Sequence, residues 1–477
     1  MSEHSTIDAG LDRPRSRFAF LLRPWFLVIV TSIVFLMAAA LVYRSTRFSG
    51  ILPIDEIVDL EAEETVRVSD DDNAFTFYQS AVSMLPPVPK EVDLNEAITR
   101  ATQGDAGWAA VRQEERDYLN SCEAALIEWQ RGTELREAVF VADANAEFAE
   151  NPVLELQRLG ILADLKAVRC LDEGKTEEAW HWLRAFLRSS RHVGQHGFTI
   201  DRAFGAALHE LAAQTIATWA ADERVSADDL QQALIEVREI YRLTPANSVT
   251  LKKDYIEIMR ALSSSSLKDF YGEGFVRRQW RAGHMFLLGD PELCQVLTRH
   301  FYANHLSQCD LPRWERTLAS TRHELFRPTG LETPPLMNVG TLDDALARSR
   351  LARMTCPRSQ ILFDLTDREQ AVQTALELCQ TAERFRRKYR AYPDSLDALV
   401  PEFLDEIPRD LFGTGPAERM LMIRRDVEIR DKDDQPLPPG LIIYSRGLDG
   451  KDSRGLKEDG DDVGLRIPLP PAGVKPE

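Results

Sequence analysis

Acidic side chains gather near the C-terminal end of the chain, in the run RGLDGKDSRGLKEDGDD at residues 446–462. Carboxylates on one short loop repel each other, and a hard divalent cation with about six to eight oxygen ligands relieves that repulsion. Gly447, Gly450 and Gly455 allow the backbone to turn tightly. The same run contains basic residues that can neutralise the acids without a metal, namely Arg446, Lys451, Arg454 and Lys457. Two interpretations therefore stay open, a cation site and a solvated charged loop.

Three other patterns are weaker signals of chemistry. His192 and His196 are four residues apart, as two ligands on one helix face would be, but no HExxH glutamate accompanies them. Ser265 and Lys268 fit an SxxK pattern, yet no KTG sequence follows. The Gly-Thr-Gly run at 413–415 lacks the lysine and the strand–helix context of a phosphate loop. We therefore assign no catalytic residue and no cofactor site to these patterns.

The overall composition restricts the partners and the compartment. The 477 residues include 76 acidic and 58 basic ones, a formal charge of −18, which repels phosphate backbones, so we expect no nucleic-acid partner. An apolar content of 44% is ordinary for a chain with two or three folded domains. The cysteines form no CxxC pair, and we expect mostly buried thiols; a bridge between Cys294 and Cys309 is the alternative in an oxidising compartment.

Residues 24–43 form the clearest element of the sequence. They read PWFLVIVTSIVFLMAAALVY without a charged residue, and a helix of this length spans about 30 Å, the thickness of a hydrocarbon core. Trp25 and Tyr43 stand at its two ends, where amphipathic rings favour the headgroup level. Four arginines precede the run, at positions 13, 15, 17 and 23. The positive-inside rule then places residues 1–23 in the cytoplasm and the body on the far side of the membrane.

Two other interpretations of this apolar run exist. The alanines at 38–40 could supply the cleavage site of a signal peptide, although signal peptides usually have an apolar region of only about 7–15 residues. A buried core helix is the third interpretation, and the absence of a polar face speaks against it. With either a membrane helix or a signal peptide, the body is exported.

Helical periodicity dominates the middle of the chain. We interpret residues 44–72 as an acidic spacer and 73–325 as a helical domain, with Ser69 and Asp72 as a capping box that opens its first helix. Residues 153–174 and 175–194 each carry an apolar stripe and meet at Gly174, which predicts an antiparallel helical hairpin. Its turn, EGKTEEA, resembles the turn of tetratricopeptide repeats, although no 34-residue repeat accompanies it.

Two further helices are predicted after this hairpin. In the first, Ala207, Leu211, Thr215 and Trp219 should share one face, and Ser226 should cap the second. The tryptophans at 180, 182 and 219 are expected in the core rather than in a ligand cage. Prolines without periodicity indicate a linker at 326–364.

The C-terminal part has a different pattern. Thr366 and Glu369 form a second capping box, and an apolar stripe from Val372 to Tyr389 predicts one long helix. Strand-like runs follow at 420–425 and 440–446. We predict a mainly α protein: an N-terminal transmembrane helix, a helical, hairpin-stacked middle domain and a small α+β domain at 365–468, followed by a disordered tail at 469–477.

The motifs of this last domain carry a resemblance. The segments AERFRRKYRAYPDSLDALVPEFLDEIPRDLFG, LIIYSRGLDGKDSRG and EDGDDV occur in this order over about residues 367–467. They resemble the globular region of type II secretion major pseudopilins, in which a helix leads into a YPxSLxxL turn and later into a YSxGxDG loop closed by a DD pair. The apolar run lacks the Gly and Glu of a prepilin cleavage site, so we expect a pseudopilin-like module rather than a pilus subunit.

The resemblance also implies a metal. In that family the YSxGxDG and DD segments hold calcium. The acidic positions that match are Asp449, Asp461 and Asp462, with Asp452 and Asp459 as additional ligands. The solvated loop stays the alternative.

These observations lead to one expectation about function. We expect a single-pass protein of the inner (cytoplasmic) membrane with a periplasmic or extracytoplasmic body, which works as a non-enzymatic scaffold or interaction protein of the bacterial cell envelope. We therefore expect a protein partner in the cell envelope. The narrower form of this hypothesis is that the protein is an accessory of a type II secretion-like system. The alternative is an envelope enzyme whose site is assembled from scattered carboxylates.

Overall fold

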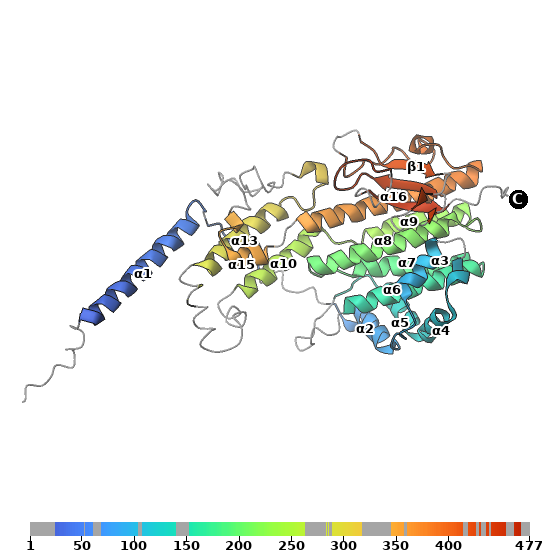
Figure 1. Cartoon of the computed structure of the whole chain (residues 1–477). Coiled ribbons are helices and arrows are strands. Elements are labelled where there is room, and N and C mark those ends of the chain that lie inside the picture. Colours follow the sequence, from blue (N-terminus) through green and yellow to red (C-terminus); the bar gives the residue numbers. More distant parts are fainter. Residues whose placement is uncertain are drawn as a thin grey trace, which may run out of the picture.

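The structure is a computed structural model in which thirteen helices are described, and the chain forms an elongated molecule (Figure 1). The described residues are 24–51, 53–60, 68–103, 107–139, 152–262, 283, 285, 289–316, 345–356, 360–413, 418–425, 429–430, 436–437, 440–454 and 462–468. The arrangement is mainly helical, with one N-terminal apolar helix and a small antiparallel sheet near the C-terminal end, as predicted.

The apolar helix α1 (Pro24–Phe48) projects from one end of the molecule (Figure 1). None of its residues is buried, and Phe35 is 72% exposed. Within the part of the chain that is described, α1 is the one helix long and apolar enough to cross a membrane, a test that a signal sequence near the N-terminus also passes. The helix continues without a break past the alanines at 38–40.

A large hydrophobic core, the distal core, lies far from α1. Around it pack α2 (Ala74–Met84), α3 (Leu94–Gln103), α4 (Gln113–Ser121), α5 (Glu123–Thr133), α6 (Pro152–Asp172), α7 (Thr176–His192), α8 (Thr199–Ala221) and α9 (Ala227–Tyr241). The predicted hairpin is α6 and α7, and Gly174 between them has a positive φ of 78°. A Cβ on Gly160 would meet the Phe186 ring at 2.1 Å, so this glycine lets the two helices approach closely.

Two details of these helices differ from the prediction. Asn73 rather than Ser69 caps α2, because its side chain accepts a hydrogen bond from the Phe75 N–H, whereas Ser69 precedes a single 3₁₀ turn, η1 (Asp70–Asp72). On α8, Thr215 and Trp219 are buried as predicted, but Leu211 is 38% exposed. Helices α6, α7, α10 and α16 and strand β5 all contact α8, so it is buried on a wider face than the single predicted stripe. The predicted stripe was therefore wrong.

A smaller hydrophobic core, the proximal core, lies next to α1. It contains α10 (Asn247–Ala261), α13 (Asp290–Leu306), α15 (Arg350–Thr355) and the short segment after α1, of which Ile51 is only 6% exposed. Glu56 accepts hydrogen bonds from Tyr255 and from Arg299. The part of the predicted spacer that is described therefore packs on the body through its apolar residues instead of running free in solvent.

One long helix, α16 (Gln360–Tyr389), connects the two cores. Phe363 near its start belongs to the proximal core, and Leu376 further along belongs to the distal core. The helix begins before Thr366, which lies inside it and donates its hydroxyl to the Phe363 carbonyl. The predicted capping box at Thr366 and Glu369 was therefore wrong.

The sheet packs on α16 and α8 (Figure 1). Its strands are β1 (Leu421–Arg425), β4 (Gly440–Ser445) and β5 (Val463–Pro468), antiparallel in the order β1-β4-β5; β2 (Ile429–Arg430) and β3 (Pro436–Leu437) form a separate hairpin. The first two strands of the sheet were predicted, and β5 was not. Side chains of the sheet and of α6 to α9 belong to one continuous core.

The cysteines and tryptophans mostly follow the prediction. All six cysteines are buried and free, so the alternative of a bridge between Cys294 and Cys309 is not realised. The rings of Trp180 and Trp219 lie 4.8 Å apart in the distal core, and Trp182 is buried as well. The Trp180 N–H donates to Glu236 and the Trp219 N–H to the Thr176 carbonyl, which satisfies both indoles.

Candidate functional site

The stretch of α16 between the two cores carries a buried carboxylate, Glu369. Its side chain is 1% exposed, and the guanidinium groups of Arg191 from α7 and Arg202 from α8 both bind it. Arg202 binds it through two nitrogens, one of which lies 3.1 Å from Oε1. Arg191 is wholly buried and also donates to the Thr244 hydroxyl at 3.1 Å. The cluster therefore joins three helices through one carboxylate.

Burial and charge act in opposite directions on this cluster. Burial raises the pKa of the Glu369 carboxyl, but the two arginines outweigh it and hold the pKa at about 2. Burial lowers the pKa of His209, which lies nearby, to about 3, so this histidine is neutral at pH 7. The His209 and Tyr241 rings are 5.9 Å apart. Glu369 is thus a permanent anion at neutral pH and is poorly suited to take up a proton.

A second ion cluster lies one half-turn earlier on α16. Asp367, whose side chain is 2% exposed, accepts from Arg316 at 2.9 Å and from Arg313 at 3.2 Å. Arg313 also binds Asp364 at 3.0 Å. Arg313 begins η3 (Arg313–Glu315), and Arg316 directly follows it. The two positive and two negative charges of this cluster balance. Because the arginines follow α13 and the carboxylates lie on α16, these ion pairs attach the segment after α13 to α16.

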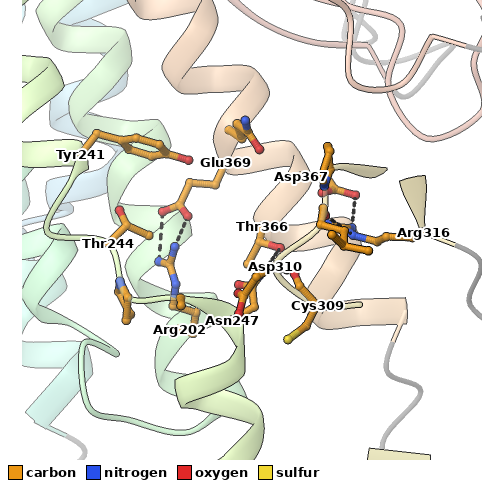
Figure 2. Close-up of a pocket in the computed structure, with 15 residues that line it drawn as sticks. Arg202, Tyr241, Thr244, Asn247, Cys309, Asp310, Arg316, Thr366, Asp367 and Glu369 are labelled. Carbon is orange, nitrogen blue, oxygen red and sulfur yellow. Dashed lines mark hydrogen bonds and ion pairs between the residues drawn. The ribbon is translucent and has the colours of Figure 1, made fainter. Parts of the chain in front are cut away.

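A pocket of about 300 Å³ opens between these two clusters, at the junction of the proximal and distal cores (Figure 2). Arg202 and Glu369 lie on one side of it, and Arg316 and Asp367 lie on the other. The N-terminus of α10 forms a further wall, where Asn247 donates to the Cys309 carbonyl at 2.9 Å. Pockets at such junctions are the usual places for small ligands.

The predicted calcium ligands lie far along the chain from this pocket. Asp459 and Asp461 fall outside the described residues. Asp449 accepts from the Lys451 backbone N–H at 2.9 Å, and Asp452 accepts from the Tyr444 hydroxyl at 2.9 Å. Asp462 is 3% exposed and lies directly before β5. Over the described positions, no group of three or more acidic, histidine or cysteine side chains is arranged to hold a metal.

The weaker sequence patterns are not brought together as sites. His192 ends α7 and its Nδ1 lies 2.6 Å from the Tyr78 hydroxyl, whereas His196 lies beyond the helix, 3.0 Å from Glu137. The two histidines therefore have separate partners. Ser265 and Lys268 lie outside the described residues, as do Thr414 and Gly415.

The residues of the pocket were missed by sequence reasoning. Glu369 was interpreted as a capping residue, and Arg191 and Arg202 were not singled out. One signal was present: Glu369 lies three residues before Val372, so a charged residue occupies the line of the apolar stripe. A charge in that position needs a buried partner.

Comparisons with protein-family models, with curated proteins and with solved structures found no match to this chain.

Proposed function

We propose that this protein is anchored in the membrane by a single helix, α1, and has an exported body. We propose further that it works as a non-enzymatic scaffold or interaction protein of the bacterial envelope. The observation that carries the proposal is the way α1 joins the body. Arg44 binds Glu292, and Arg47 binds Asp290 at 2.6 Å, so the last turn of α1 is fastened to the first turn of α13. A helix fixed in this way sets the height and tilt of the body above a bilayer.

The distribution of arginines supports the proposed orientation. Four arginines precede Pro24, at positions 13, 15, 17 and 23, whereas only Arg44 and Arg47 stand at the other end of α1. The N-terminal side is therefore richer in arginine, and the positive-inside rule assigns that side to the cytoplasm of an inner membrane.

The continuity of α1 favours an anchor over a cleaved signal peptide. The helix has 25 residues, well beyond the roughly 7–15 apolar residues of a signal peptide. The alanines at 38–40 lie inside it, and the residues that follow them contact α13. Phe48 and Arg44 also lie about 3 Å from where a Cβ on Gly289 would stand, so the anchor and the body are packed together.

The ion clusters support a scaffold more than an enzyme. Glu369 and Asp367 are each held by two arginines, which stabilises the ionised form and stiffens the junction between the cores. A general acid or base needs a pKa nearer the working pH. The enzyme alternative would need a proton-transfer group that these pairs do not supply.

The narrower proposal, an accessory of a type II secretion-like system, depends on the C-terminal module. Its support is the sequence resemblance together with the arrangement of α16 on an antiparallel sheet of three strands. Calcium bound by the 446–462 loop belongs to the same proposal.

Topology can be tested with two reporters on the C-terminus. Alkaline phosphatase fused after Glu477 should be active and green fluorescent protein should be dark, because the body is exported. The intact product should resist carbonate extraction and keep its N-terminus on sequencing. Replacing the arginines at 13, 15, 17 and 23 by glutamate should reduce the exported fraction. A cytosolic reporter, or release by carbonate, would contradict the anchor.

The scaffold role can be tested by affinity purification of the full chain from solubilised membranes, with mass spectrometry of what remains bound. A stoichiometric envelope protein is expected. Cross-links between that protein and the body would support the proposal, and recovery of the chain alone after mild cross-linking would contradict it.

Calcium binding should be tested on the full chain, because the module shares its core with the helices. Calcium should raise the melting temperature more than magnesium does, and Asp449→Asn should remove the difference. Asp405→Asn, the same change at an exposed position without a role in the loop, is the control. Equal behaviour of calcium and magnesium in the unmodified protein would favour the solvated loop.

A further inference from the structure

We propose that the junction pocket binds a small ligand through an oxyanion, a carboxylate or a phosphate group. The first observation is the charge of the cluster beside it. Two arginines and one glutamate give a net charge of +1, and the three side chains are no more than 2% exposed. A buried net charge is costly without a counter-charge, so an anion entering the pocket supplies what the cluster lacks.

The second observation is the supply of hydrogen-bond donors around the pocket. Arg202 lines it, and the Arg202 Nε–H has no hydrogen-bond acceptor among the described residues. Tyr241 and Thr244 contribute hydroxyl groups to the same lining. α10 begins at the pocket with Ala246 before it, a residue without a side chain that can cap the helix. Donors and a positive helix end favour a ligand rich in acceptor oxygens.

Three carboxylates also line the pocket, and they must be weighed against this proposal. Two arginines bind Glu369, so its negative charge is more than neutralised. Two arginines also bind Asp367, and together with Asp364 the charges of that cluster balance. Asp310 is different: it is exposed, has no arginine or lysine partner over the described positions, and accepts the Ser248 N–H at 3.3 Å. Asp310 therefore occupies the end of α10 at the rim and weakens the attraction for an anion.

This role of Asp310 gives a test in which binding should improve. The full-length protein in detergent is titrated with inorganic phosphate and, separately, with acetate, at ionic strength held constant by chloride. Binding is followed by calorimetry and by the melting temperature. One of the two anions should stabilise the protein beyond chloride, and Asp310→Asn should tighten its binding several-fold. The anion with the larger effect identifies the group as phosphate or carboxylate.

Two further variants keep the test decisive. Asp405→Asn changes the net charge equally at a remote exposed site and should leave the affinity unchanged. Arg202→Gln should abolish binding while leaving one arginine for Glu369, so the remaining pair is neutral. If phosphate and acetate both act as chloride does, or if the Asp310 and Asp405 variants change equally, the pocket is not an oxyanion site. If the Arg202 variant fails to fold, the anion affinities of Asp310→Asn and Asp405→Asn still test whether the pocket binds an oxyanion.

Discussion

Two buried glutamates lie on the same helix, α16, and their surroundings shift their pKa values in opposite directions. Glu369 is held by Arg191 and Arg202 from two other helices, and its pKa is lowered to about 2. Glu383 is bound by Arg386 at 2.7 Å and by Arg387 at 3.0 Å, yet burial raises its pKa. Two arginines beside a buried carboxylate therefore do not always lower its pKa.

The difference lies in what else the arginines bind. Arg386 and Arg387 come from the same helix as Glu383, and their remaining nitrogens donate to the carbonyls at the end of α8, including those of Ala221 and Ala220. Their charge is shared with those carbonyls and with Glu223. Arg191 also donates to the Thr244 hydroxyl and to the Gly205 carbonyl, but among the described residues Arg191 and Arg202 bind no carboxylate other than Glu369. The anionic form of a buried carboxylate is more stable when its arginines are not shared with a second carboxylate, as Arg386 is shared with Glu223.

The largest expected effect is the loss of the Glu369 charge. Glu369→Gln leaves two buried arginines without an anion and should lower the free energy of unfolding by about 3–5 kcal/mol at pH 7. Urea denaturation of the full chain in detergent measures this. Glu377→Gln is the matched control on α16, because Glu377 is more exposed, pairs with one arginine among the described residues, Arg238, and otherwise accepts from Gln373; it should cost less than about 1 kcal/mol. If both variants lose the same free energy of unfolding, the Glu369 cluster stabilises the fold no more than the partly exposed pair of Glu377 and Arg238 does.

A smaller effect should appear as opposite pH dependences. The folded pKa of Glu369 is below its ordinary value of 4.5, so its stabilising contribution is present above that pH and is lost as the pH falls toward 2. The folded pKa of Glu383 is raised, so its contribution is present at acidic pH and is lost as the pH rises through that pKa. The stability difference between the unmodified protein and each glutamine variant, compared at pH 4 and pH 7, should change in opposite directions. Parallel changes would remove the distinction between the two sites.

The smallest effect is expected for Glu383→Gln at pH 7. Glutamine keeps an oxygen that accepts the Tyr392 hydroxyl, which lies 2.6 Å from Oε1, and the arginines retain their bonds to the carbonyls at the end of α8. The free energy of unfolding should change by about 1 kcal/mol or less. A loss as large as that of the Glu369 variant would mean that the local arginines depend on this carboxylate after all.

Local patterns were sufficient for part of the fold. The α6–α7 hairpin, the Ser226 cap and strands β1 and β4 each follow from residues that are close in sequence, such as Gly174 with its positive φ. Strand β5 was missed because its sequence, VGLRIP, contains a glycine and ends in a proline, which are depleted in strands. Its place in the sheet comes from pairing with β4 and from Gln214 of α8, which donates to the Arg466 carbonyl. The burial face of α8 was also misjudged, since packing on several sides gives no single stripe.

The candidate pocket could not be predicted, because its residues come from four separate parts of the chain. Glu369 and Arg202 are far apart in sequence; Arg202 stands in no motif, and Glu369 was assigned to a capping box. Of the predicted metal ligands, Asp459 and Asp461 lie outside the described residues, so calcium binding stays a prediction.

The sequence by itself determined the apolar helix, because an uncharged run of that length is decided by local hydrophobicity and needs no partner. It also indicated several of the helical segments, since that depends on periodicity within about 15 residues, although α15 and the start of α16 lie within the predicted linker at 326–364. Only the tertiary structure decided that the segment after α1 packs on the body and that α16 carries a buried ion cluster between two cores. Such contacts depend on distances between residues far apart in the chain, which no local pattern encodes.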